Sequence, residues 1–280
     1  MRIVNLIENT EGKPGCVYEH GLSFYIETDD HKLLLDLGQT GNSLQNAQSL
    51  GIDLTAADTV VLSHGHYDHS GGIVPFAGIN DKAVIYMQKS ATGEYYADDG
   101  YAADGDRYRY IGIDKDILKL PQVMLLQGDH VIDDELELFT IKKRTHILPF
   151  TNKRLLIKTT DGYVSDDFAH EQYLVIKEKG QSVLISGCAH NGILSILDAY
   201  KEKYGNQPDI VISGFHLMIK REYREDELEE VRAIAEELKS YRSRFYTCHC
   251  TGLPAFEEMK KIMGDALEYV HSGEEIELSR

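Results

Sequence analysis

Short runs of apolar and β-branched residues, bounded by Gly, Asp or Asn, dominate the first third of the chain. These runs predict strands over residues 2–6, 22–27, 32–36 and 59–62. Between them Leu44, Ala47 and Leu50 recur three positions apart and Gly51 follows, which predicts a short helix over residues 42–50 that ends at a left-handed cap. From there on, strands and helices alternate along the sequence.

The remaining two thirds continue this alternation, with two interruptions. Strands are predicted over residues 123–126, 136–140, 173–177, 183–185, 210–213 and 245–247, and helices over residues 192–204, 225–240 and 253–263. Residues 88–119 and 142–169 break the pattern and are expected to be irregular insertions. Because no Pro-rich or Gly/Ser-rich linker divides the chain, a single compact α/β domain over residues 1–280 is the simplest organisation.

The first insertion is rich in tyrosine. Its members are Tyr95, Tyr96, Tyr101, Tyr108 and Tyr110. We expect this cluster to pack the insertion onto the body of the protein, with a lid over one face as the alternative. Substrate specificity is expected to reside in the two insertions, which carry no readable motif.

Composition and charge narrow the class of protein. With 42% hydrophobic and 27% charged residues in 280, the chain can bury a sizeable core. Lys+Arg 29 against Asp+Glu 46 gives a net charge of −17, so nucleic acid and anionic membranes are not expected as partners. The longest apolar stretches are strand-sized, so no membrane span is expected. The N-terminus lacks the apolar core of an export signal, so a cytoplasmic location is expected.

The most informative segment is residues 60–72, VVLSHGHYDHSGG, in which three histidines and an aspartate follow an apolar strand. In an extended segment His64, His66 and Asp68 point to one side, and a turn at Asp68 brings His69 toward the same pocket. The Gly71-Gly72 pair lets the backbone turn into a helix. Imidazole and carboxylate groups at this spacing form a site for divalent ions. Four donors exceed what one catalytic ion takes from so short a segment, so two ions are expected.

The His-x-His-x-Asp-His pattern, with Asp36-Leu37-Gly38 upstream, resembles the metallo-β-lactamase fold superfamily. That resemblance implies a four-layer αβ/βα sandwich with a dinuclear site at the edge of its sheets. Further motifs resemble the branch named for 7,8-dihydropterin-6-methyl-4-(β-D-ribofuranosyl)-aminobenzene-5′-phosphate synthase. These are Glu19-His20-Gly21-Leu22-Ser23, Ser186-Gly187-Cys188-Ala189-His190-Asn191-Gly192-Ile193, Gly214-Phe215-His216-Leu217 and Cys248-His249-Cys250-Thr251-Gly252.

The resemblance implies a role for each matching residue. The first ion would be held by His64, His66 and His190. The second ion would be held by Asp68, His69 and His249. Zn is the favoured metal, and Mn and Fe suit the same nitrogen and oxygen ligands. Asp68 is also a candidate catalytic residue, because its carboxylate can orient the attacking hydroxide that two metal ions make available at neutral pH.

Several positions keep two interpretations. Cys188 stands where the superfamily usually has a metal-bridging aspartate, and it either bridges the ions or packs. His170 rivals His190 as the third ligand of the first ion. His216, after the strand over residues 210–213, either serves the site, by binding substrate or shuttling protons, or is a core histidine. His20 either approaches the pocket or lies on the surface. Cys248 and Cys250 either pack as small buried side chains or bind metal. If residues 245–250 are extended, both face away from His249, which favours packing.

These features predict a metal-dependent hydrolase that acts on a small anionic molecule, with a phosphorylated metabolite favoured. Two alternatives stay open: a pterin-linked transferase, which the branch name implies, and a catalytically silent metal-binding sensor. Processing of nucleic acid conflicts with the negative charge. Redox chemistry at two irons usually places Glu where His66 stands, and β-lactam hydrolysis usually requires an export signal. The sequence does not specify the oligomeric state.

Overall fold

The computed structural model describes residues 1–100 and 106–278. Its helices and strands follow in this order: β1 (Arg2–Ile7), β2 (Ser23–Glu27), β3 (Lys32–Leu35), α1 (Asn42–Ser49), β4 (Thr59–Val61), α2 (Tyr67–Ser70), α3 (Ile73–Ala77), β5 (Val84–Gln88), β6 (Tyr95–Asp98), β7 (Tyr108–Tyr110), β8 (Val123–Leu126), β9 (His130–Val131), β10 (Leu136–Phe139), β11 (Leu155–Thr159), β12 (Gly162–Ser165), β13 (Tyr173–Glu178), β14 (Gln181–Ile185), α4 (Ile193–Tyr204), β15 (Ile210–Ile212), α5 (Glu225–Leu238), β16 (Arg244–Thr247), α6 (Leu253–Met263), β17 (Leu267–Tyr269) and β18 (Glu275–Ile276). Short 3₁₀ helices span Leu54–Ala56, Lys89–Thr92, Lys115–Lys119, Phe150–Arg154, His249–Thr251 and Gly264–Ala266.

The chain forms two compact units. Unit 1 comprises Met1–Gly128, Asn152–Glu171 and His271–Arg280, and unit 2 comprises Asp129–Thr151 and Gln172–Val270. The single domain predicted over residues 1–280 stays a prediction. Among the described residues, no helix combines the length and the apolar character that a bilayer span requires.

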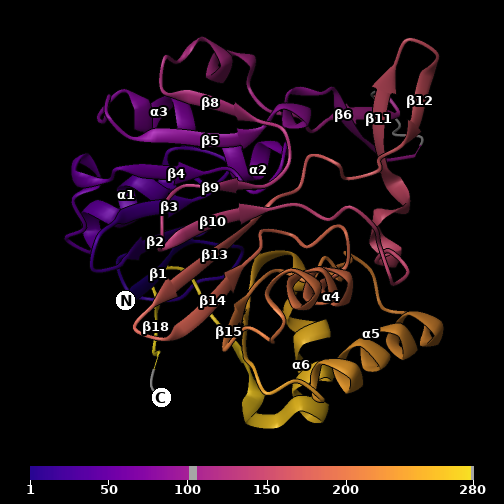
Figure 1. Ribbon diagram of the computed structural model, residues 1–280. Coiled ribbons are helices and arrows are strands. Elements are labelled where there is room, and N and C mark those ends of the chain that lie inside the picture. Colours follow the sequence, from indigo (N-terminus) through magenta and orange to yellow (C-terminus); the bar gives the residue numbers. More distant parts are fainter. Residues whose placement is uncertain (101–105, 279–280) are drawn as a thin grey trace. The chain divides into compact units, whose positions relative to one another are not determined.

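Unit 1 is built on a seven-stranded sheet with the strand order β18-β1-β2-β3-β4-β5-β8 (Figure 1). Strands β3, β4, β5 and β8 are parallel, so their carboxyl ends meet at one edge. Helices α1 and α3 pack onto one face of this sheet, where Ala47 and Phe76 join the strand residues Leu34, Val60 and Ile85 in a buried core. The predicted strands over residues 2–6, 22–27, 32–36 and 59–62 are confirmed within one or two residues.

The two expected insertions are not irregular, and this expectation is wrong. Strands β6 and β7 of the first and β11 and β12 of the second form one four-stranded antiparallel sheet, in the order β12-β11-β6-β7. Tyr96, Tyr108 and Tyr110 lie on these strands, and the ring of Tyr96 is 5.0 Å from that of Tyr163. Tyr95 is buried instead, and Tyr101 lies outside the described residues. The cluster is therefore largely a cross-strand contact of this sheet.

Unit 2 is built on a second seven-stranded sheet, in the order β17-β16-β15-β14-β13-β10-β9. Strands β14, β15, β16 and β17 are parallel, which again brings their carboxyl ends to one edge. Helices α4, α5 and α6 lie close together in Figure 1 and share a core with the sheet, in which Leu197, Val231 and Met259 meet Val211 and Phe245. The predicted helices and strands of the last third are confirmed, and α6 matches its prediction at both ends.

Candidate metal centre

The histidine-rich segment of unit 1 begins directly after β4. His64 and His66 lie in the loop, and the backbone of His66 is extended. The chain then turns at Tyr67 into the single-turn helix α2, which carries Asp68 and His69. The extended course predicted as far as Asp68 is therefore wrong: the helix, not strand alternation, positions the last two donors. All four side chains are buried.

One carboxylate orients two of these histidines. Asp36 follows β3 and is fully buried, with its backbone in the left-handed region at φ 59°. Its oxygens accept hydrogen bonds from the Ser63 amide at 2.7 Å, the Ser63 hydroxyl at 2.7 Å and Nδ1 of His69 at 2.6 Å. Because the Ser63 hydroxyl donates to Asp36, its oxygen accepts from Nδ1 of His64, 2.8 Å away. Both rings thus keep their proton on Nδ1 and present the lone pair of Nε2.

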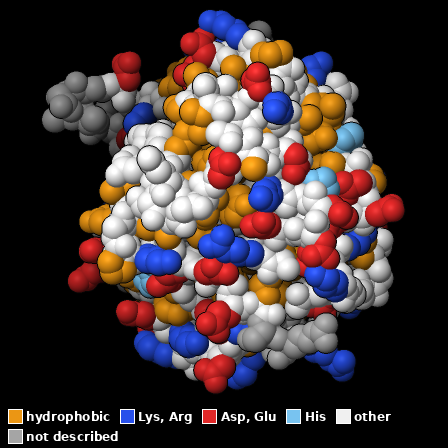
Figure 2. Space-filling model, turned by 90° about the vertical axis from the view of Figure 1, so that its left-hand side faces the viewer, with side chains coloured by type: hydrophobic (Ala, Val, Ile, Leu, Met, Phe, Trp, Pro, Cys, Tyr) orange, Lys and Arg blue, Asp and Glu red, His pale blue; other side chains and the backbone are white. Residues whose placement is uncertain are grey.

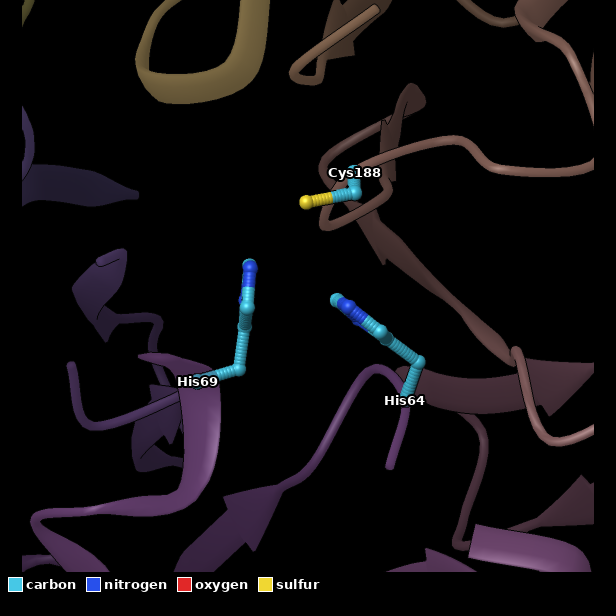
Figure 3. A group of neighbouring side chains, drawn as sticks. All are labelled: His64, His69 and Cys188. Carbon is cyan, nitrogen blue, oxygen red and sulfur yellow. The ribbon is translucent and has the colours of Figure 1, made fainter. Parts of the chain in front are cut away.

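Figure 3 shows the rings of His64 and His69 converging from their separate backbone positions. Their centroids are 4.2 Å apart, and His66 lies 4.6 Å from His64. Burial disfavours the charged form of His69, but the Asp36 carboxylate outweighs this and raises the pKa of His69. Burial, together with the nearby His170, lowers the pKa of His66 to about 3. His66 is therefore neutral at physiological pH, which is the form that binds a metal ion.

His170 lies beside this group, and both of its ring nitrogens are occupied. Nδ1 accepts the amide proton of Gly65 at 2.9 Å, and Nε2 contacts the Asp166 carboxylate at 3.0 Å. Burial opposes ionisation of Asp166, but hydrogen bonding to His170 prevails and lowers the pKa of that carboxyl. This hydrogen bonding favours a supporting role for His170: it holds the loop backbone at Gly65, and the Asp166 contact fixes its ring.

The Asp68 carboxylate lies near two histidines of unit 1, His20 and His69. Nε2 of His20 is 3.2 Å from its carboxylate, and Nε2 of His69 is 3.9 Å from the same oxygen. The His20 side chain is 46% exposed. His20 is thus both at the surface and in contact with a candidate ligand, so the two readings left open by the sequence are compatible.

The candidate residues of unit 2 lie at the carboxyl ends of three parallel strands. Cys188 and His190 follow β14, His216 follows β15, and His249 follows β16. Cys188, His190 and His249 are buried, whereas His216 is partly exposed. Ligand sites of open α/β sheets characteristically lie beyond the carboxyl ends of parallel strands.

His190 and His216 are neighbours, with ring centroids 4.1 Å apart. The Thr151 hydroxyl donates to the carbonyl oxygen of His216 and lies 2.7 Å from its Nδ1. Because that hydroxyl proton is already used, Nδ1 of His216 is the donor to the Thr151 oxygen. The lone pair of His216 is then on Nε2, so this nitrogen can accept a proton.

The backbone around His249 is not extended, which overturns one step of the sequence argument. His249 begins a 3₁₀ turn, His249–Thr251, with φ 49°. Strand alternation therefore does not separate it from its neighbours: a ring nitrogen of His249 and the sulfurs of Cys188 and Cys250 all lie within 4.8 Å of one another. Cys248 is buried and is not part of this group.

Sequence reasoning assigned no role to several residues that shape these groups. Asp36 stood in a motif that was recognised, but its hydrogen bonds were not foreseen. Asp166 and Thr151 lie in the second insertion, where no local pattern marked them. The alternation argument favoured packing for Cys250 over metal binding, although its spacing from Cys248 and its place beside His249 were visible signals.

Comparisons with known proteins agree with this architecture. Residues 18–147 match the family model of the metallo-beta-lactamase superfamily. An uncharacterized protein of Methanocaldococcus jannaschii is 28% identical over 266 residues, covering 92% of this chain and 93% of that protein. The 7,8-dihydropterin-6-methyl-4-(beta-D-ribofuranosyl)-aminobenzene-5′-phosphate synthase of the same organism is 26% identical over 295 residues, covering 98% and 95% of the two chains.

A solved structure of a metal-dependent hydrolase of the beta-lactamase superfamily, Tm1679, superposes with a TM-score of 0.81 at 27% identity over 100% of both chains. The predicted α/β fold class and the predicted resemblance are therefore confirmed. The fold implies binding of a divalent metal ion. The similarity of this chain is to a superfamily of metal-dependent hydrolases.

Proposed function

We propose that this chain, whose fold is that of the metallo-β-lactamase superfamily, is a dinuclear metal-dependent hydrolase that acts on a small anionic, phosphorylated metabolite. The observation that carries the proposal is the buried hydrogen-bond network of Asp36, Ser63, His64 and His69. A carboxylate that fixes the tautomer of an imidazole is the usual support of a metal-binding histidine. The donor set therefore fits divalent metal ions.

The ligand assignment is carried over from the superfamily motifs. In this proposal His64, His66 and His190 hold one ion, and Asp68, His69 and His249 hold the other. Zn is favoured, with Mn and Fe as alternatives that the same nitrogen and oxygen donors accept. The neutral state of His66 and the Nε2 lone pairs of His64 and His69 support the unit 1 half of this assignment.

The ions would supply Lewis-acid activation of water and of a phosphoryl or carbonyl oxygen. The protein side chains supply orientation and proton transfer. Contact with His20, whose Nε2 is 3.2 Å away, orients the Asp68 carboxylate. His216, held by Thr151 through Nδ1, can take a proton at Nε2 and return it to the leaving group.

The charge distribution supports a small anionic substrate in preference to a polyanion. The net charge is −17, and on the face shown in Figure 2 acidic and basic side chains are interspersed. A long polyanion would meet this unfavourable field over its whole length, whereas a small anion interacts only with the local cationic centre. Nucleic acid is therefore not proposed as a substrate.

Metal analysis combined with a substrate screen tests the proposal. Protein reconstituted with Zn, Mn or Fe should retain about two equivalents of metal and hydrolyse members of a panel of phosphomonoesters, phosphodiesters and lactones. His66→Ala should lower kcat by at least about 100-fold, whereas His31→Ala, at a histidine bonded to Asp58 instead, should leave kcat unchanged. One equivalent of metal or less after reconstitution would refute the dinuclear proposal.

A transferase is the second candidate, because the relative that matches 98% of this chain is named as a synthase. Transfer differs from hydrolysis only in the nucleophile that reaches the electrophilic carbon or phosphorus. Supplying a pterin with an activated methyl group together with a ribofuranosyl-aminobenzene phosphate distinguishes the two. A product in which the two substrates are joined supports the transferase. Displacement of the leaving group by water, without a joined product, supports the hydrolase.

A further inference from the structure

Two cysteines and a histidine of unit 2 form a group whose composition differs from the rest of the candidate centre. The sulfurs of Cys188 and Cys250 and a ring nitrogen of His249 lie within 4.8 Å of one another, and all three residues are buried. They come from the loops after β14 and β16, two strands that flank β15 in a parallel sheet. Residues distant in sequence are thus brought together by the sheet edge.

The local backbone makes room for the second sulfur. A Cβ atom at Gly214 would lie 2.4 Å from the sulfur of Cys250, so a larger residue at this position would displace that side chain. The amide of Gly214 donates to the carbonyl oxygen of Gly187 at 2.8 Å, which ties the loop of Cys188 to the loop after β15. The thiol of Cys250 points to the Cys188 carbonyl oxygen, 3.6 Å away. These contacts join the loops that carry the two sulfurs, which lie within 4.8 Å of each other.

The spacing suits one tetrahedral metal ion. With Zn–S bonds of about 2.3 Å and tetrahedral angles, two sulfur ligands lie about 3.8 Å apart. Separations within 4.8 Å therefore need shifts of an ångström or less, which side-chain rotation can supply. Two cysteines and one histidine with an open fourth position are a known arrangement of catalytic zinc.

We propose that Cys188, Cys250 and His249 bind one soft divalent ion, Zn²⁺ above all, through two thiolates and one imidazole. The inference deepens the proposed function and rests on it for His249 as a ligand. The ion is the second ion of that proposal, in which Cys188 and Cys250 take the places given there to Asp68 and His69; Cys250 is the new member. Binding releases the proton of each thiol, and the fourth position stays available for water or substrate. Thiolate ligands select Zn²⁺ over Mn²⁺, which prefers oxygen donors.

Cobalt substitution tests the ligand set without relying on activity. Metal-free full-length protein is titrated with Co²⁺ under reducing, oxygen-free conditions. Thiolate coordination produces a sulfur-to-cobalt charge-transfer band in the near ultraviolet, whose intensity increases with the number of coordinating sulfurs. We expect this band in the wild-type protein and its reduction by about half in Cys188→Ser and in Cys250→Ser.

Cys248→Ser and Cys16→Ser are matched controls and should leave the band unchanged, because neither sulfur is in the group. Should the Cys250 variant fail to fold, the zinc K-edge absorption of the wild-type protein still counts the sulfurs, since a Zn–S shell near 2.3 Å is distinct from Zn–N.

Two outcomes would overturn the inference: cobalt binding without a charge-transfer band, or a band that Cys250→Ser leaves intact. Either would leave the hydrolase proposal standing, because nitrogen and oxygen ligands would then hold the metal. Absence of any cobalt binding would instead refute the proposed function together with this site.

Discussion

Asp36 satisfies three hydrogen-bond donors at once, and only an acceptor with no proton of its own can do so. The amide and hydroxyl of Ser63 and Nδ1 of His69 all donate to its carboxylate. In Asp36→Asn an NH₂ group would face one of these donors. We expect the affinity for Zn²⁺ to fall by about 10–100-fold, the usual effect of losing a partner of a metal-binding histidine. Competition with a chromophoric chelator measures this change.

Ser63→Ala is the matched control for that measurement. It removes the hydroxyl that links His64 to Asp36 but leaves the Asp36–His69 contact in place. The loss of affinity should therefore be smaller than in Asp36→Asn. Equal zinc affinities in the wild type and in Asp36→Asn would show that the carboxylate does not support the ligands.

At the scale of residues, the sequence predicted the candidate metal ligands better than the residues that orient them. The spacing of His64, His66, Asp68 and His69 was sufficient, since all four come from one short segment. The role of Asp36 depends on the left-handed backbone at that residue and on the parallel pairing of β3 with β4. Neither feature has a local pattern in the sequence, so the network could not be foreseen.

Helix α5 has an anchored N-terminus that offers a test at the scale of elements. Two hydrogen bonds from Arg221 at 2.8 and 2.6 Å, and one from the Arg224 amide at 3.0 Å, hold Glu227. Hydrogen bonding from Arg221 is the largest cause that lowers the pKa of Glu227 to about 2. A lowered pKa stabilises the fold above the unfolded pKa of about 4.3, and this stabilisation is lost as the pH falls toward 2.

Glu227→Gln should therefore lower the urea midpoint at pH 7, and the difference from wild type should shrink between about pH 4.3 and pH 2. Paired urea titrations at pH 7 and at about pH 3 measure this. Glu229→Gln, at an exposed position of the same helix, is the control and should show no such dependence. A difference in urea midpoint between Glu227→Gln and wild type that is as large at about pH 3 as at pH 7 would contradict the argument.

Helices and strands were predictable where apolar residues recur at a regular spacing within one segment. Helix α6 carries Ala255, Met259 and Met263 on one buried stripe, and its predicted bounds are correct. The four-stranded sheet was missed because β6 pairs with β11 across a long separation in sequence, and its exposed strands lack a regular apolar pattern. The turn at His249 was missed because a positive φ at a histidine has no signature in composition.

At the scale of the whole molecule, the two units share one design. Each has its own buried core, and each places its candidate ligands at the carboxyl ends of parallel strands. The net charge of −17 adds a field that attracts divalent cations and repels polyanions. Metal binding is thus favoured both by the local donors and by the overall charge.

Removal of metal should lower the thermal stability of the chain. An ion that binds only the folded state at about 100 times its Kd stabilises that state by about 2.7 kcal/mol. For a chain of this size each kcal/mol shifts Tm by about 2–4 °C, so dialysis against a chelator should lower Tm by about 5–10 °C.

Scanning calorimetry of the metal-loaded, chelated and zinc-restored protein measures this shift. Added Zn²⁺ should restore the original Tm, whereas Mg²⁺, which prefers an octahedral shell of oxygen ligands, should not. A Tm that stays the same while metal analysis shows complete removal would mean that the ions contribute nothing to the folded state. The imidazoles would then have to be held in place by the Asp36 network and the packed sheet edge alone.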